Sequence, residues 1–333
     1  MKLILDKWRL LALGGVVLGL AVAGLVYRDF RGFLSHRVAK TTELSIAKGW
    51  GIQKIAGELA ERQVVASPLW FVFLDQFHGT GSIKAGYYRF EPGEDAATVL
   101  KRLRSGDVAK GRLVIAEGLT VREVVDHMRK AGLQEAVTAL ADPALPQRLG
   151  ANVRSLEGYL FPDTYIYRVK DPKDDLVTRI ITQGRKVFEQ EWLTRPTGYA
   201  LTAYEALIIA SMIEKETGQV AERSHVSGVF HNRLKRKIKL QSDPTVVYGI
   251  PEFSGPITRA HLLAPTPYNT YVNQGLPPTP ICNPGRASIH AALHPDETED
   301  LYFVARGDGT HLFARTLPEH NKNVARMHRP GGG

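Results

Sequence analysis

The chain has 333 residues, with 43 Lys and Arg against 34 Asp and Glu, which gives a formal net charge of +9. Because 44% of the residues are apolar, the chain can bury a hydrophobic core and is not disordered overall. Its one cysteine, Cys282, excludes an internal disulfide framework and a cysteine-rich zinc module. The length allows about two or three domains.

The excess of positive charge indicates an anionic partner such as a nucleic acid, a lipid surface or an acidic polymer. The densest basic run lies between Arg233 and Lys239, where five of seven residues are cations. Such a run is also typical of a solvated face after a helix. Because no recognisable nucleic-acid-binding motif accompanies it, nucleic acid is not among the predicted partners.

The N-terminal region contains an apolar segment from Leu10 to Tyr27, 18 residues without a charge. As a helix it would be roughly 27 Å long, about the thickness of the hydrocarbon core of a membrane. A cleaved signal peptide usually has a shorter apolar region of about 7–15 residues. We therefore predict an uncleaved transmembrane helix over residues 10–27. Basic residues flank the segment on both sides, so the positive-inside rule alone does not fix its orientation.

The next region repeats a short pattern, G-x5-[IV]-x3-[LM], which begins at Gly49, Gly93 and Gly118. Each copy indicates a turn at glycine and then a short helix whose apolar residues lie one turn apart. Strand-like runs precede the three copies, at residues 43–46, 86–90 and 112–116. Residues 41–145 are thus predicted to be a small α/β region, which resembles LysM carbohydrate-binding modules. A generic α+β packing module is the alternative.

A proline-containing segment, Asp142-Pro-Ala-Leu-Pro146, interrupts this pattern and marks a predicted domain boundary. Residues 146–327 form the second predicted domain, of mixed α+β class. Within it, residues 301–305 and 311–315 flank a glycine-rich turn and predict a hairpin, and His320 opens the last predicted helix. Residues 328–333 end in three glycines and are expected to form a flexible tail.

One carboxylate lies near the end of an unusually apolar predicted helix. Residues 204–217 predict a helix that Thr202 can cap, and residues 206–213 are nearly apolar all round, so most sides of this helix are expected to be buried. Glu214 continues one buried stripe, whereas Glu216 is offset by about 200° and should lie on the other side. Desolvation would raise the pKa of Glu214 and suit it to general acid catalysis. The alternative is a solvated helix end at which Glu214 is paired with a cation.

Polar side chains in the turn-rich segments around this helix could line a groove. Gln241, Asp243 and Tyr248 surround one predicted turn, Asn269 lies in another, and Glu157 lies in an aromatic, turn-forming segment. Amides, carboxylates and aromatic rings suit the hydroxyls and faces of sugars, but they also occur in ordinary cores.

Other chemistries have weaker sequence support. His290 and His294 could lie on one helix face as a zinc pair, but the glutamate of the H-E-x-x-H motif is missing and Pro295 stops the helix. No G-x-S-x-G, P-loop or G-x-G-x-x-G motif occurs in the chain. No metal site is therefore predicted.

Ordered motifs through the chain resemble one known family, the YceG-like endolytic lytic transglycosylases, also called endolytic murein transglycosylases. The resemblance extends from the apolar segment to about residue 327. The motifs that carry it are Leu156-Glu-Gly158, Phe161-Pro-Asp-Thr164, Ala210-Ser-Met-Ile-Glu-Lys-Glu-Thr217, Phe230-His-Asn-Arg-Leu234, Leu240-Gln-Ser-Asp-Pro-Thr-Val-Val-Tyr-Gly249, Tyr268-Asn-Thr-Tyr271, Gly275-Leu-Pro-Pro278, Asn283-Pro-Gly285, Ala292-Leu-His-Pro295, Leu301-Tyr-Phe-Val304 and His320-Asn-Lys322. His231 and the basic run Lys235-Arg-Lys237 depart from the family pattern.

The resemblance implies a single-pass protein of the bacterial inner membrane, with residues 1–9 in the cytoplasm and with a LysM-like region and a catalytic domain in the periplasm. It also implies that Glu214 is the catalytic residue. When protonated, Glu214 would donate to the oxygen that links N-acetylmuramic acid to N-acetylglucosamine. As a carboxylate it would then accept the proton of the muramoyl C6 hydroxyl, which closes on C1 and leaves a 1,6-anhydro end within the strand.

This reaction requires neither a metal nor an organic cofactor. Glu157, Gln241, Asp243, Tyr248 and Asn269 are the residues expected to align the glycan. The implied partners are peptidoglycan glycan strands, the inner membrane and peptidoglycan synthases. Two alternatives stay open: a non-catalytic glycan-binding scaffold of the cell-wall synthesis machinery, and a hydrolase that uses Asp243 as its second carboxylate.

Overall fold

The computed structural model describes the backbone of residues 2–77, 81–149, 153–170 and 175–327, and the side chains from residue 13 onward within these ranges. By its packing the chain divides into two compact units, one of residues 1–111 and 166–174 and one of residues 112–165 and 175–333. The elements, in chain order, are α1 Lys2–Ser35, β1 Thr42–Ile46, α2 Ile52–Glu61, α3 Pro68–Phe77, β2 Gly86–Phe90, α4 Ala96–Ser105, β3 Lys110–Ile115, α5 Val121–Lys130, α6 Gln134–Leu140, α7 Leu145–Leu149, β4 Asp163–Arg168, α8 Leu176–Thr194, α9 Ala203–Glu216, the 3-10 helix η1 Val220–Glu222, α10 Arg223–Lys235, α11 Asp243–Gly249, α12 Arg259–Leu262, α13 Arg286–Leu293, β5 Tyr302–Ala305, β6 His311–Ala314 and α14 Leu317–Met327.

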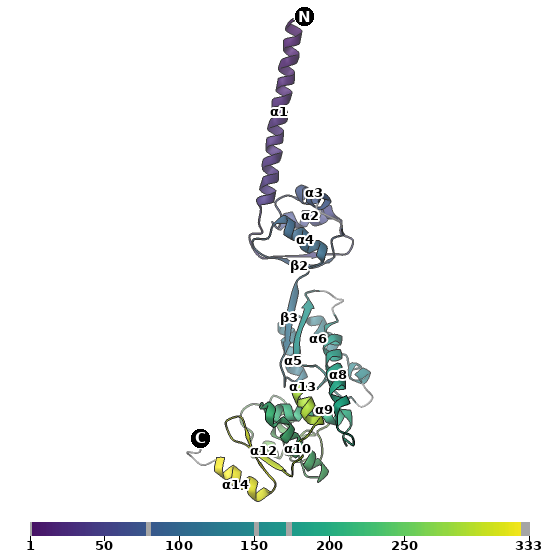
Figure 1. Cartoon of the computed structure of the whole chain (residues 1–333), viewed down its shortest axis with the longest axis vertical. Coiled ribbons are helices and arrows are strands. Elements are labelled where there is room, and N and C mark those ends of the chain that lie inside the picture. Colours follow the sequence, from purple (N-terminus) through teal and green to yellow (C-terminus); the bar gives the residue numbers. More distant parts are fainter. Residues whose placement is uncertain (1, 78–80, 150–152, 171–174, 328–333) are drawn as a thin grey trace. The chain divides into compact units, whose positions relative to one another are not determined.

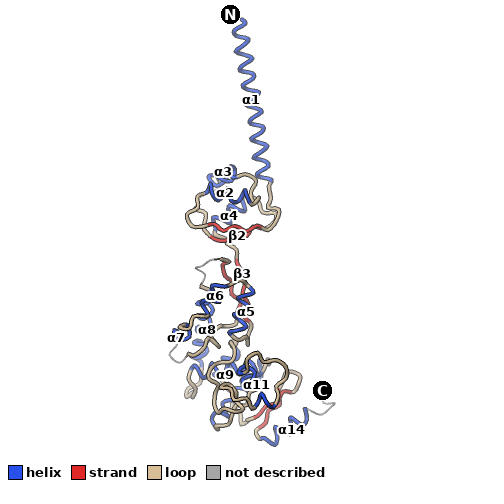
Figure 2. The backbone as a smooth tube through the Cα atoms, turned by 180° about the vertical axis from the view of Figure 1, so that it is seen from behind, coloured by secondary structure: helices blue, strands red, loops and turns tan. Residues whose placement is uncertain are grey.

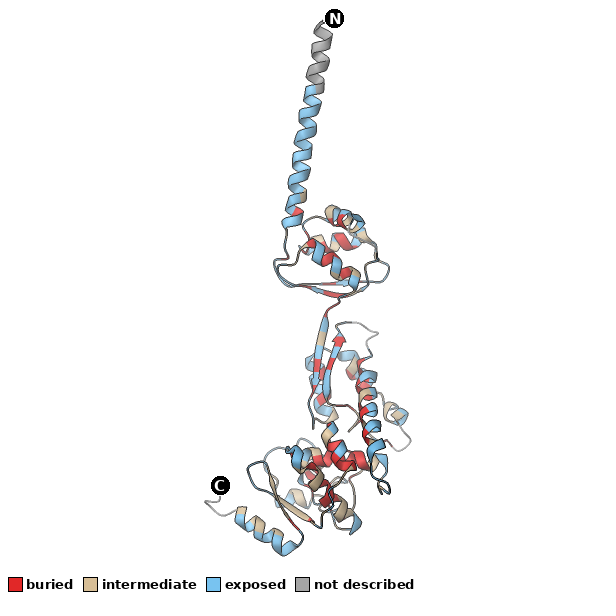
Figure 3. Ribbon diagram, in the orientation of Figure 1, coloured by how far each residue is buried: buried red, intermediate tan, exposed pale blue. Residues whose placement is uncertain are grey.

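Helix α1 contains the predicted transmembrane segment and continues beyond it to Ser35. The stretch Leu13–Ser35 is long and apolar enough to cross a membrane, and its apolar side chains are exposed (Figure 3). At its C-terminal end the environment changes, because Phe33 is fully buried in the core of the first unit. The C-terminal end of α1 therefore packs into the core of the first unit.

The first unit contains the first two copies of the glycine repeat, and both fold as predicted. Strands β1 and β2 pair antiparallel, from Thr42 opposite Phe90 to Ile46 opposite Gly86. Helices α2 and α4 follow the repeat glycines and lie beside this two-stranded sheet (Figures 1 and 2). The apolar positions of the repeat are the buried ones, and they are Ile55, Leu59, Val99 and Leu103. Helix α3 was not predicted, although Ser67-Pro68 is a typical helix start.

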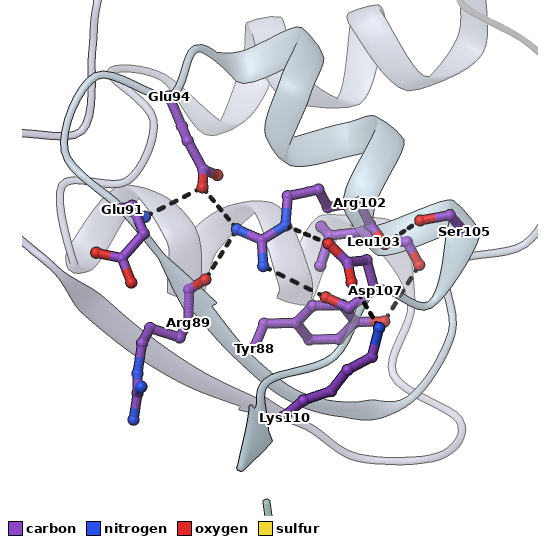
Figure 4. Close-up of polar contacts among 9 residues, drawn as sticks. All are labelled: Tyr88, Arg89, Glu91, Glu94, Arg102, Leu103, Ser105, Asp107 and Lys110. Carbon is purple, nitrogen blue, oxygen red and sulfur yellow. Dashed lines mark hydrogen bonds and ion pairs between the residues drawn. The ribbon is translucent and has the colours of Figure 1, made fainter. Parts of the chain in front are cut away.

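A partly buried cation fixes the end of helix α4 in this unit (Figure 4). Arg102 donates to the Glu94 carboxylate at 2.6 Å, to Asp107 at 3.1 Å and to the backbone oxygen of Arg89 at 2.9 Å. Tyr88 lies under this network, with its hydroxyl on the backbone oxygens of Lys84 and Leu103. The network ties strand β2 to the loop after α4.

The third copy of the repeat belongs to the second unit. Strand β3 pairs with β4, and α5 follows Gly118 with Val124 and Met128 buried. The packing thus divides the chain near residue 111, whereas the sequence analysis placed a boundary at residues 145 and 146. The LysM-like character of residues 41–145 stays a prediction.

The core of the second unit surrounds helix α9, which packs against α10, α11 and α13 (Figure 3). All eight residues of segment 206–213 are buried, as predicted. Strands β5 and β6 form the predicted hairpin, with Tyr302 opposite Ala314. Helix α14 begins at Leu317 rather than at His320, because the Glu319 side chain accepts hydrogen bonds from the backbone N–H groups of residues 315 and 316 and so caps an earlier start. The mixed α+β class is confirmed.

Candidate active site

Helix α9 ends in two glutamates that point to different surroundings. The helix starts at the predicted cap, where Thr202 and Glu205 form a reciprocal capping box. Its last turn contains Glu214 and Glu216, two residues apart and therefore on different sides of the helix. Each lies in its own cluster of contacts within the second unit.

Glu214 is bound on both of its oxygens. One accepts from the Arg223 guanidinium at 3.3 Å, and the other accepts from the backbone N–H of Gly285 at 2.9 Å. The side chains of Glu214 and Arg223 are only 6% and 7% exposed. The predicted burial of Glu214 is thus present, together with the cation partner of the alternative interpretation.

A second carboxylate, Glu117, completes this cluster and was not predicted. It lies 3.8 Å from the Arg223 guanidinium and is half exposed. A Cβ atom at Gly285 would lie 1.8 Å from a Glu117 carboxylate oxygen, so a side chain at this position would require the half-exposed Glu117 to move. Glu117 directly precedes the glycine of the third repeat, and nothing in the sequence spacing relates it to Arg223.

A cavity of about 610 Å³ adjoins the other glutamate. It lies among the end of α9, the start of α11, the β5–β6 hairpin and α14, and it is lined by Glu216, Arg233, Leu240, Gln241, Asp243, Tyr271, Leu301, Tyr302, Phe303, Val304, Ala305, His311, Leu317, His320 and Asn321. Its walls combine carboxylates, amides and aromatic rings, whereas Glu214 is not part of the lining.

Glu216 is held in this cavity by Ser242, whose hydroxyl donates to it at 2.5 Å. Desolvation by burial raises the pKa of Glu216 to about 7, and the nearby Asp243 carboxylate adds to the rise, while the Ser242 hydrogen bond opposes it. The carboxyl group can therefore both give and take a proton near neutral pH.

Two other predicted residues, Gln241 and Asp243, line the same cavity. The hydroxyl of Tyr271 donates to Asp243 at 2.6 Å, and the buried Arg233 donates to the Gln241 side-chain oxygen at 3.2 Å. Gln241 adopts a φ of +52°, a conformation that costs energy for a residue with a side chain. Asp243 begins helix α11 and is followed by Pro244, so the segment predicted as a turn forms a short helix.

Glu157 and Tyr248 form a separate contact. The Tyr248 hydroxyl donates to Glu157 at 2.7 Å, and the backbone N–H of Val121 donates to the other oxygen. Burial raises the pKa of Glu157 to about 6. This pair joins α11 to the first turn of α5 and does not line the cavity of Glu216.

The raised pKa of Glu157 predicts a pH-dependent stability. The unfolded chain loses this proton near pH 4.5, whereas the folded chain keeps it to about pH 6, so stability falls as the pH rises through this window. The expected loss is about 2 kcal/mol. Glu157→Gln should remove it, which thermal unfolding of both proteins between pH 4 and about 7 would show. Parallel stability profiles for the two proteins would contradict the prediction.

Asn269 is fully buried, and its amide group is used within its own loop. The side-chain nitrogen donates to the backbone oxygens of His261, Leu262 and Ala264, and the oxygen accepts from the backbone N–H of Tyr271. Its contribution is to shape the loop that carries Tyr271 into the cavity. The predicted site residues thus lie in four places. Gln241 and Asp243 line the cavity of Glu216, Glu157 contacts Tyr248, Asn269 is buried in its own loop, and Glu214 is ion-paired with Arg223.

Comparisons with known proteins agree with this arrangement of motifs. The model of the YceG-like family matches residues 44–326. The endolytic murein transglycosylase of Bacillus subtilis strain 168 is 32% identical over 301 residues, which are 85% of this chain and 83% of that protein. The protein of the same name from Streptococcus pneumoniae strain D39 is 29% identical over 86% of this chain, which spans only 58% of its length.

A solved structure supports the same assignment. The crystal structure of a YceG-like protein from Listeria monocytogenes superposes with a TM-score of 0.55 at 29% identity, over 85% of this chain and 98% of that chain. The family match extends from strand β1 to helix α14 and so includes the cavity of Glu216 and the ion pair of Glu214. The chain belongs to the YceG-like family.

Proposed function

We propose that the protein is a peptidoglycan lytic transglycosylase and that Glu216 is its catalytic acid and base. The observation that carries the proposal is the raised pKa of a cavity-lining carboxyl group, Glu216, among amide, carboxylate and aromatic side chains. The relatives named endolytic murein transglycosylase supply the substrate class.

The reaction needs one carboxyl group and no water. Protonated Glu216 donates its proton to the glycosidic oxygen as the bond from this oxygen to C1 of the N-acetylmuramoyl residue breaks. The resulting carboxylate takes the proton of the C6 hydroxyl, and the C6 oxygen bonds to C1. One product carries a 1,6-anhydro ring and the other a free C4 hydroxyl, and Glu216 is protonated again.

Glu216 fits this role better than Glu214, the residue expected from the sequence. Both oxygens of Glu214 are occupied, one by the Arg223 guanidinium and the other by the Gly285 N–H. Glu216 has one neutral hydroxyl partner and a neighbouring negative charge. A general acid must hold a proton at working pH, and the raised pKa of Glu216 meets this condition.

The other cavity residues suit a glycan. Asp243, fixed by Tyr271, could offset the positive charge that develops at C1, and the amide nitrogens of Gln241 and Asn321 are candidate donors to acetamido and hydroxyl oxygens. Glu157 and Tyr248 would act by positioning α11, and Asn269 by shaping its loop.

A hydrolase is the second candidate function, because Asp243 and Glu216 line one cavity and interact electrostatically. In that case Asp243 would activate water or attack C1. The products distinguish the two functions. Digestion of purified glycan strands by the full chain and by Glu216→Gln, followed by mass spectrometry, should give internal 1,6-anhydro ends with the wild type alone. Reducing ends would instead support the hydrolase, and intact strands with a folded wild type would support the glycan-binding scaffold.

The membrane arrangement is part of the proposal. Helix α1 would anchor the protein in the bacterial inner membrane, with both compact units in the periplasm, where the substrate is made. The α/β repeats of the first unit would serve as a LysM-like glycan-binding region, and peptidoglycan synthases are the expected protein partners.

The pKa of Glu216 gives a testable pH profile. Because the protonated form is the acid, kcat should fall as the pH rises through about 7. Ser242→Ala removes a hydrogen bond that lowers this pKa, so the falling limb should move to higher pH. Asp243→Asn removes a charge that raises the pKa, so the limb should move to lower pH. Shifts in the same direction, or no shifts, would contradict the assignment of Glu216.

A further inference from the structure

Helix α3 exposes an apolar stripe on the surface of the first unit. Eight of its ten residues are apolar or proline, and Phe71 and Leu74 face the core. Leu69 is 71% exposed, Phe73 43% and Phe77 70%. These three residues are spaced by four, so they lie on one face of the helix. A face of this kind on a soluble unit normally contacts a partner.

Helix α3 is joined to the C-terminal end of α1 by direct contacts of Trp70, the residue after Leu69. The indole N–H of Trp70 donates to Asp29 at 2.8 Å, and the Trp70 ring lies 4.8 Å from the ring of Phe30. Both views draw α3 beside this end of α1 (Figures 1 and 2). Trp70 in turn contacts Phe73 at 5.8 Å, and Phe73 contacts Phe77 at 4.4 Å. A row of aromatic rings therefore runs from α1 along α3.

The contacts on α1 lie where the helix would leave the bilayer. The charge-free segment ends at Tyr27, and Arg28 and Asp29 follow it directly. Arg31 lies over the Tyr27 ring at 5.9 Å, an arrangement typical of the headgroup region, where aromatic and basic side chains gather. Since Asp29 and Phe30 hold Trp70, helix α3 is tied to the level of the membrane surface.

We propose that the stripe of Leu69, Phe73 and Phe77 docks the first unit onto the surface of the bilayer that α1 spans. The inference rests on the proposed anchoring by α1. The apolar face would enter the boundary between headgroups and acyl chains to a depth of about 5–10 Å. The core face of α3 stays packed on the unit, so docking requires no unfolding. The unit is then fixed against the membrane rather than tethered loosely to it.

Lipid quenching of a fluorescent label tests the proposal on the full chain in liposomes. Single cysteines are introduced as Leu69→Cys and Phe77→Cys and labelled with a polarity-sensitive dye, because the native Cys282 is buried. Lys101→Cys on α4 is the matched control in the same unit, since its side chain is exposed. Val17→Cys, within the apolar part of α1, reports on the anchor itself.

Labels at Leu69 and Phe77 should be quenched by shallow lipid quenchers at least about threefold more strongly than the label at Lys101. Adding Leu69→Ser and Phe73→Ser should lower the quenching at Phe77 by about half, and circular dichroism would show that the fold is kept. Quenching at Val17 by quenchers placed deep in the acyl chains, with no shallow quenching at Leu69 and Phe77, would overturn the docking but leave the anchor intact. Absence of quenching at Val17 would overturn the anchor instead. Labels shielded from water without lipid quenching would indicate a second protein on the stripe and would also overturn the proposal.

Discussion

Glu216→Gln is expected to lower kcat on glycan strands by about 10³-fold, within the range usual for the loss of a general acid–base residue. Glutamine keeps the shape of the side chain and can still accept from Ser242, so the cavity and the fold should be preserved. It can neither donate the proton to the glycosidic oxygen nor take the C6 hydroxyl proton. Because the loss concerns the transition state, KM should change little.

The matched control is Glu214→Gln, which places the same substitution two residues away on the same helix. Its kcat, measured on folded protein below the unfolding temperature, should stay within about tenfold of the wild type. Quantifying 1,6-anhydro ends by mass spectrometry gives both values. If Glu214→Gln abolishes cleavage and Glu216→Gln does not, the role returns to Glu214 and the assignment made from the cavity is wrong.

Glu214→Ala is expected to lower the free energy of unfolding of the second unit by about 3 kcal/mol. Within the described part of the chain, the substitution leaves the buried Arg223 guanidinium with the half-exposed Glu117, 3.8 Å away, as its ion-pair partner, and it removes the acceptor of the Gly285 N–H. Removing one partner of a buried ion pair costs more stability than the pair contributes, because the remaining charge stays buried with neither water nor its partner to compensate it. Urea unfolding followed by fluorescence measures the change.

The double variant Glu214→Leu/Arg223→Met separates this cost from general disruption. Replacing both charges with apolar side chains leaves no unpaired buried charge, so the double variant should recover most of the loss of Glu214→Ala. A double variant that is less stable than the single one would show that the ion pair itself contributes net stability. Charge reversal at an exposed residue of the same unit, Lys186→Glu, should change stability by less than about 0.5 kcal/mol.

The sequence predicted most of the secondary structure because local rules determine it. The glycine repeat marks three helices whose buried positions are the apolar residues of the pattern, and Thr202 caps helix α9 where expected. The hairpin β5–β6 follows from two apolar runs around a glycine turn. The ordered motifs also indicated the family, which the comparisons confirm. Each of these inferences depends on residues close together in the chain.

Helix periodicity also predicted that Glu214 and Glu216 lie on different sides of α9, but it could not say what each one meets. Arg223 and Gly285 reach Glu214 from other segments, and Ser242 reaches Glu216 from the start of α11. Burial beside the Asp243 carboxylate raises the pKa of Glu216, whereas Glu214 meets a cation and a backbone N–H. The sequence by itself determined the repeat helices, helix α9, the hairpin, the family and the placement of Glu214 and Glu216 on different sides of α9. Only the tertiary structure decided their surroundings, because electrostatic environment depends on groups that are distant in the chain and close in space.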